Sequence, residues 1–113
     1  MITIEKLKDF GCNVEEGLGR CLNNEAFYLR LVNSILQDNK VDLLEEALNQ
    51  GDLQKAFEAA HALKGVYGNL AITPLYVKVS EITELLRSKT EMDYKPLMSE
   101  IRELFTRFVS LAD

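Results

Sequence analysis

The chain has 113 residues, of which 47% are apolar, so it can bury one hydrophobic core but has no room for a second domain. Its 18 acidic and 13 basic residues give a net charge of -5, and neither sign forms a block, which argues against nucleic acid and anionic membranes as partners. The N-terminus lacks the apolar core of a signal peptide, and we expect a soluble cytoplasmic protein. Cys12 and Cys21 lack metal-ligand spacing and are expected to be free thiols that fill apolar space.

Short helices are predicted in the N-terminal part of the chain, over about 3–37. The first runs through TIEKLKDFG and ends at Gly11, and a second begins at Asn13 with Glu16 as its partner in a capping box. Gly17 and Gly19 lie inside this second segment and argue against a helix there, because glycine has a low helix propensity. Asn24 is predicted to cap a third helix. Its apolar residues form one stripe: Phe27, Tyr28, Leu31, Val32 and Ile35. We expect these helices to cover one end of a larger bundle.

Four longer helices are predicted to follow, near residues 40–50, 52–70, 74–88 and 94–111. Asp52 is expected to cap the second of them, and Thr73 to cap the third, with Pro74 at the first helical position. Apolar residues in the last two recur at intervals of four and three, the spacing of helices packed nearly antiparallel. No stretch alternates as a strand does. The sequence therefore predicts an all-α fold, an antiparallel four-helix bundle over about 40–111 with additional short N-terminal helices.

The only histidine of the chain, His61, falls outside the apolar stripe of its predicted helix. Stepping about 100° per residue places it on an outward strip with Gly65 and Gly68, and Lys64 lies between it and the core. A glycine inside a helix costs about 1 kcal/mol relative to alanine. Side chains lean toward the helix N-terminus, so a large residue at 65 would lie across the imidazole. We interpret Gly65 as keeping the ring uncovered, whereas close approach of another helix is an alternative for Gly68.

An exposed imidazole can act as a nucleophile near neutral pH, and a neighbouring ammonium group suits phosphoryl transfer. The run AAHALKGVYGNLAITPL resembles the signature of histidine-containing phosphotransfer (HPt) domains, and the resemblance covers about residues 24–111. The residues that match the signature are His61, Leu63, Lys64, Gly65, Gly68 and Leu70. Ala71 departs from it, because the family often has glycine there.

The resemblance implies a phosphorelay intermediate. His61 would accept a phosphoryl group from the aspartyl phosphate of a receiver domain and pass it to another receiver. Lys64 would steady the phosphoryl oxygens, while Gly65 and Gly68 would leave room for the docking partner. The implied partners are the receiver domains of response regulators. A hybrid sensor kinase is a further candidate partner.

The same resemblance implies a phosphocarrier without its own kinase site, formed by one domain over 1–113. The sequence contains no nucleotide-binding glycine-rich loop. We expect no cofactor and no metal site, because the Mg²⁺ of such reactions belongs to the acidic pocket of the receiver. A monomer is expected.

Two other interpretations stay open. A helical binding module could dock receivers or another protein through the same face without carrying phosphate. Alternatively, an enzyme could use His61 as a general base, with Glu58 one turn earlier as the orienting acid, although no nucleophile or metal site converges on it. Tyr67 and Tyr76 are expected in the core, with their hydroxyls near its rim.

Overall fold

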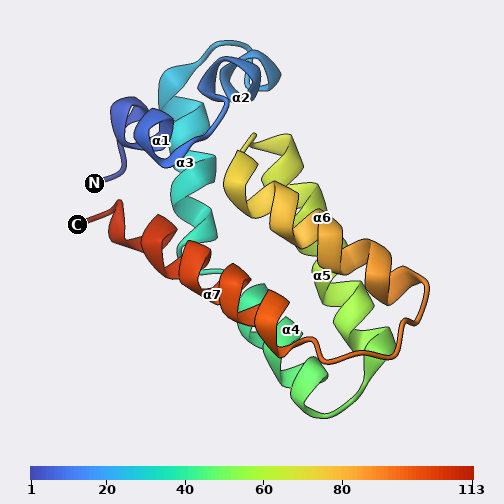
Figure 1. Ribbon diagram of the computed structural model, residues 1–113. Helices are drawn as coiled ribbons and strands as arrows, with labels where there is room; N and C mark the ends of the chain where they lie inside the picture. Colours follow the sequence, from blue (N-terminus) through green and yellow to red (C-terminus); the bar gives the residue numbers. More distant parts are fainter.

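The computed structural model describes all 113 residues as an all-α protein of seven helices (Figure 1). The helices are α1 (Ile4–Phe10), α2 (Val14–Arg20), α3 (Glu25–Ile35), α4 (Lys40–Asn49), α5 (Leu53–Asn69), α6 (Thr73–Arg87) and α7 (Lys95–Ser110). The predicted fold class is confirmed, and the four longer helices lie within one residue of their expected bounds. No helix is both long and apolar enough to cross a membrane.

The last four helices form the bundle. Consecutive members run antiparallel in Figure 1, with α5 packed along both α4 and α6, and α7 lying against α6 and α4. The α4–α5 turn closes at Gly51, whose φ of +71° favours glycine. Leu44 of α4, Leu63 of α5, Ile82 of α6 and Ile101 of α7 are among the fully buried side chains that these helices share.

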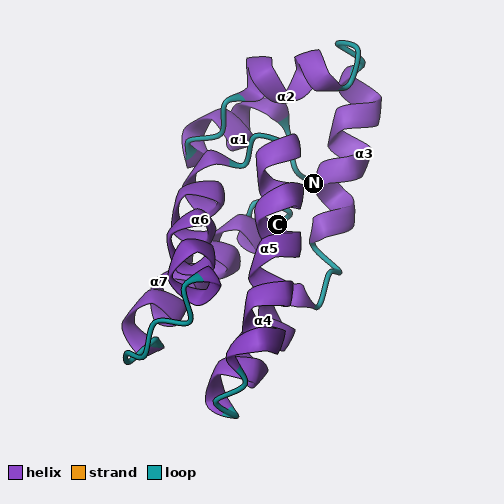
Figure 2. Cartoon of the chain, turned by 90° about the vertical axis from the view of Figure 1, so that its right-hand side faces the viewer, coloured by secondary structure: helices purple, strands orange, loops and turns teal.

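The first three helices lie toward one end of this bundle, as Figures 1 and 2 show, with α3 leading from that end back to the start of α4. Gly17 of α2 fits so tightly that an added Cβ would lie 2.5 Å from Cε1 of Tyr28 and 2.8 Å from the carbonyl oxygen of Leu70. The buried Tyr28 hydroxyl donates a hydrogen bond of 2.9 Å to that same carbonyl. The end of α5 is therefore joined closely to both α2 and α3.

Two of the predicted helix caps are confirmed. The side chain of Asn24 accepts a hydrogen bond from the backbone N–H of Phe27, and that of Asp52 accepts one from the N–H of Lys55. Gly11 ends α1 in a left-handed conformation with φ +108°, as predicted. These local signals set where α1 ends and where α3 and α5 begin.

The predicted cap at Thr73 is wrong. Thr73 is itself the first residue of α6, Ile72 precedes the helix, and no side chain caps it. The hydroxyl of Thr73 instead accepts a hydrogen bond of 3.2 Å from the backbone N–H of Asn13 and donates one of 3.3 Å to the carbonyl of Ala71. This side chain is used to join the start of α2 to the α5–α6 turn.

The same junction changes the capping box expected at Asn13. The side chain of Asn13 caps α2 by accepting from the N–H of Glu16. In return, the Glu16 carboxylate accepts a hydrogen bond of 3.2 Å from the side-chain amide of Asn13. In a capping box the carboxylate would instead accept from the backbone N–H of Asn13. The backbone N–H of Asn13 donates to the carbonyl of Ala71, so contact with the α5–α6 turn replaces half of the box.

Both cysteines are buried free thiols, as predicted. Burial raises the pKa of the Cys12 thiol to about 11, although a backbone hydrogen bond from Thr73 partly opposes this shift. Cys12 therefore stays protonated and unreactive near neutral pH. Tyr67 lies in the core, as predicted, but the expectation that its hydroxyl lies near the rim is wrong, because the hydroxyl is fully buried and has no hydrogen-bond partner. The predicted core position of Tyr76 is wrong, because this residue lies at the surface with 36% of its area exposed.

Candidate functional site

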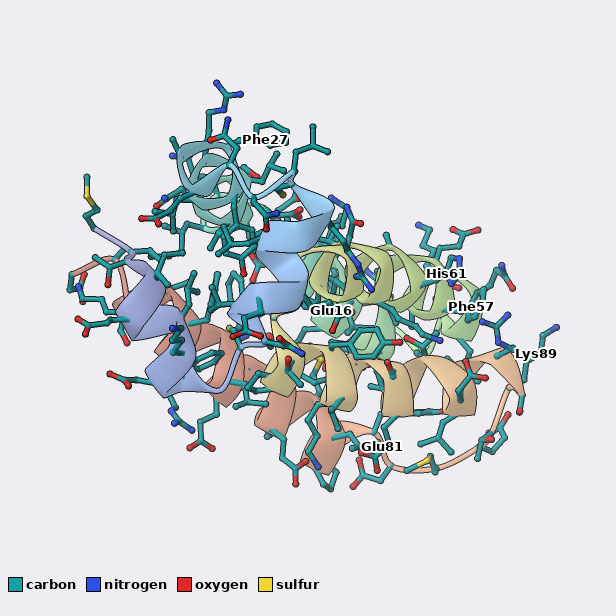
Figure 3. All side chains as sticks on the ribbon, turned by 90° about the horizontal axis from the view of Figure 1, so that it is seen from above. Glu16, Phe27, Phe57, His61, Glu81 and Lys89 are labelled. Atoms are coloured by element: carbon teal, nitrogen blue, oxygen red, sulfur yellow. The ribbon has the colours of Figure 1, made fainter.

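His61 lies near the middle of α5 and is exposed, which confirms its predicted outward position. The opposite side of α5 is anchored in the core by Ala56, Ala60, Leu63 and Tyr67, all buried. Because these anchors recur at three- and four-residue intervals, they fix the rotation of the helix about its axis. Figure 3 shows the labelled imidazole on the outer side of α5.

The imidazole of His61 stacks on an aromatic ring one turn earlier in α5. The ring of Phe57 lies 5.6 Å from that of His61 between centroids, with 18° between their planes. The guanidinium carbon of Arg87, from the end of α6, lies 5.0 Å from the Phe57 ring centre. The four-residue spacing of Phe57 from His61 was the signal in the sequence for this contact. A stacked ring restricts the rotation of the imidazole and still leaves the histidine in contact with solvent.

Lys64 lies one turn after His61, and its ammonium group faces α6. Its Nζ atom is 3.8 Å from the Glu84 carboxylate, which also pairs with Nε of Arg87 at 3.3 Å. The Glu84 side chain is 58% exposed, and exposed ion pairs contribute only about 0–1 kcal/mol. The ammonium group can therefore turn to another anion at little cost. Sequence periodicity had given no sign of Glu84 or Arg87 at this site.

The two glycines of the motif have different surroundings. A Cβ added at Gly65 would meet no atom within 4 Å, so the surface beside His61 is open, as the sequence interpretation required. A Cβ added at Gly68 would lie 2.8 Å from Cε1 of Tyr76. The alternative of close helix approach therefore applies to Gly68, over which the Tyr76 ring of α6 lies.

The other titratable groups around this face do not assemble a second kind of site. Glu58 is exposed, and its carboxylate accepts a hydrogen bond of 3.4 Å from Gln54. No three His, Cys, Asp or Glu side chains are grouped so as to hold a metal ion. What the arrangement offers is one accessible imidazole, oriented by an aromatic ring, with two cationic side chains held nearby by a carboxylate. Such a site can bind an anion and accept an electrophile on nitrogen.

The helical bundle presents one exposed histidine beside a lysine and an open glycine, as the sequence resemblance implied. Comparison with protein families matches residues 36–110 to the Hpt domain, and the chain belongs to this family. Hpt domains take part in histidine phosphotransfer in two-component phosphorelays, where they interact with receiver domains as phosphocarriers. The match begins just after α3, at residue 36, later than the residue 24 at which the resemblance was expected to start. No curated protein and no solved structure matches the chain.

Proposed function

We propose that this chain is a phosphorelay intermediate whose phosphorylated residue is His61. The observation that carries the proposal is that the only histidine of an Hpt domain lies exposed at mid-helix, within the matched residues. In the transfer, the unprotonated outer nitrogen of the imidazole attacks the phosphorus of a receiver's aspartyl phosphate. The P–O bond to aspartate breaks, and the aspartate leaves as a carboxylate. The reverse step, onto a different receiver, completes the relay.

Lys64 is the group proposed to stabilise the phosphoryl oxygens. In the unphosphorylated protein its ammonium group pairs with Glu84 at 3.8 Å. A phosphoryl group on His61 brings close to two negative charges one helical turn away, which compete with the single charge of Glu84. The ammonium group therefore turns toward the phosphoryl group after transfer. Gly65 leaves space in which the receiver reaches the imidazole.

We further infer that the bundle over 40–111 and the helices over 3–37 act together as one domain. One continuous cluster of buried side chains extends from Ile2, before α1, to Phe108 of α7. The rings of Phe10 in α1 and Phe108 lie 5.9 Å apart. Loss of α1 would uncover apolar surface on α7.

The test is transfer of labelled phosphate from purified phosphorylated receiver domains to the parent chain and to the His61→Gln variant. The parent is expected to acquire phosphate that is labile in acid and stable in alkali, and the variant to acquire none. Because position 61 is exposed, helix content and melting temperature of the variant should stay near those of the parent. Labelling that persists in the variant would contradict the proposal, and a parent that binds receivers without acquiring phosphate would support the binding-module alternative.

A further inference from the structure

Helix α2 lies at the end of the surface that carries His61, although it precedes the residues that match the family. The guanidinium group of Arg20 donates a hydrogen bond to the carbonyl oxygen of Gly68, two turns beyond His61. It also pairs with the carboxylate of Glu16, and these two side chains are 45% and 47% exposed. The N-terminal helices thus add an exposed pair of opposite charges to the end of α5.

A groove of about 420 Å³ separates α2 from α6 at this point. Glu16 and Arg20 line one side of it, Gly68 lies at the end of α5, and Tyr76 and Val77 line the α6 side. Tyr76 is 36% exposed and Val77 is 55% exposed, so the α6 side is apolar and accessible. The groove therefore has one apolar wall and one charged wall. Protein interfaces combine the same two kinds of surface, an apolar core and a polar rim.

The groove is continuous with the surface around His61. At 1.5 Å per residue, the seven residues from His61 to Gly68 span only about 10 Å along the helix. Gly65 lies between them, and apart from its chain neighbours and the adjacent backbone of α5 no atom lies within 4 Å of where its Cβ would be. A protein interface buries about 800 Å² on each partner, which corresponds to a disc about 16 Å in radius. A partner centred on His61 therefore reaches the groove.

The α2 wall of the groove is already in place before a partner binds. Gly17 leaves no space between α2 and the α5 end, where Leu70 contributes the carbonyl oxygen. The N–H of Asn13, just before α2, donates to the carbonyl of Ala71 at 3.2 Å. A wall fixed on both sides costs little conformational entropy on binding.

We propose that α2 is part of the docking surface for the receiver domain that exchanges phosphate with His61, and that it helps select which receiver binds. This inference rests on the proposed function. An apolar side chain of the receiver contacts Tyr76 and Val77, while polar groups of the receiver pair with Glu16 and Arg20. The occupant is a receiver because the groove is continuous with the place where the receiver must deliver phosphate.

The test compares two phosphoryl donors on the full chain. One is the phosphorylated receiver that labels the parent fastest among a purified panel. The other is phosphoramidate, a small molecule whose P–N bond breaks with release of ammonia as the imidazole takes the phosphoryl group. Arg20→Glu and Val77→Glu should each lower kcat/KM for the receiver about tenfold, mainly through KM, as loss of an interface contact does. Labelling by phosphoramidate should stay within about twofold of the parent, because so small a donor makes no contact with the groove.

Two controls carry matched changes outside the groove. Arg30→Glu reverses an exposed arginine of α3 that lies over the ring of Phe27, 5.5 Å from its centre. Leu22→Glu changes a residue of the turn between α2 and α3 that is 90% exposed. Figure 3 shows Phe27 far from the labelled His61. Both controls should transfer phosphate from the receiver at the parent rate.

Val77 makes none of the contacts that hold α2 in place. A loss of transfer in Val77→Glu therefore cannot be explained by displacement of α2. The inference is wrong if receiver transfer to either Arg20→Glu or Val77→Glu equals that of the parent, or if the two controls lose as much as the groove variants. Failure of the parent to accept phosphate from either donor is a separate result, which overturns the proposed function itself.

Discussion

The surface around His61 and the joint between α2 and α5 use glycine in opposite ways. At Gly65, beside His61, an added methyl group would touch nothing within 4 Å, whereas at Gly17, in the joint, it would lie 2.5 Å from the Tyr28 ring. The first glycine keeps a surface clear, and the second lets two helices approach. The difference shows that the open surface is built on tightly packed helices and is not a loosely folded region.

The largest effect on stability is expected in the joint. Gly17→Ala places a methyl group against the buried Tyr28 ring and the backbone oxygen of Leu70, and neither can move without breaking the hydrogen bond between them. Overpacking of this kind costs about 1–3 kcal/mol. The free energy of unfolding in urea should fall by that amount.

Gly19→Ala is the matched control for Gly17→Ala. Gly19 also lies within α2, but an added Cβ there would meet no atom within 4 Å. Its replacement should raise the free energy of unfolding by up to about 1 kcal/mol through helix propensity alone. Equal effects at the two positions would show that α2 is not fixed against α5 as the structure has it.

A smaller effect, with opposite signs for stability and function, is expected beside His61. Gly65→Ala and Gly65→Gln should raise the free energy of unfolding by up to about 1 kcal/mol, because position 65 is open. The same variants should accept phosphate from a receiver more slowly, and glutamine should slow transfer more because its side chain leans over the imidazole. Thermal melting and transfer rates measure the two effects separately.

Gly68→Ala sharpens this comparison on the same helix. Its methyl group would lie 2.8 Å from the Tyr76 ring, so displacement of the ring offsets the gain in helix propensity. Gly68→Ala should therefore be less stable than Gly65→Ala. A Gly65→Gln variant that melts well below the parent would show instead that position 65 is a packing contact.

The smallest effects are expected at the ion pairs beside His61. Lys64→Ala should shorten the lifetime of the phosphohistidine, and Glu84→Gln should lengthen it, because Glu84 holds the Lys64 ammonium group at 3.8 Å. Exposed pairs contribute about 0.2–1 kcal/mol, so each change should be no more than about fivefold and should shrink at high salt. The lifetime is measured as loss of label from the purified phosphorylated protein.

Glu81→Gln is the matched control for Glu84→Gln. Glu81 is on the same helix, pairs with Lys78 at 3.6 Å and has similar exposure, but Figure 3 shows it far from the labelled His61. Its replacement should leave the phosphohistidine lifetime unchanged. A longer lifetime in both variants would indicate an effect of net charge in place of the pairing with Lys64.

Features set by local sequence were predictable. Asn24 and Asp52 cap their helices because a short polar side chain reaches the N–H three residues on. The outward direction of His61 followed from the periodicity of α5, whose buried face is set by large and small apolar residues in its own sequence. The bundle followed from the same periodicity in the neighbouring helices.

Features set by contacts between helices were not predictable. Glu84 and Arg87 reach the site only because α6 packs on α5 in a register that places Tyr76 over Gly68, and periodicity within one helix does not give that register. Thr73 carries the local signal of a cap, but its hydroxyl bonds to the N–H of Asn13, a residue sixty positions earlier. A tertiary hydrogen bond therefore overrode the local preference.

The two ends of the chain lie side by side in Figure 1. The terminal ammonium group donates to the carbonyl of Ala112, and Nζ of Lys6 donates to the carbonyls of Leu111 and Asp113 at 3.1 and 2.9 Å. A short peptide linker would therefore close the chain into a ring, which can be reopened at the exposed turn around Gly51. Such a circular permutant keeps every helix of the bundle and leaves the surface around His61 unobstructed.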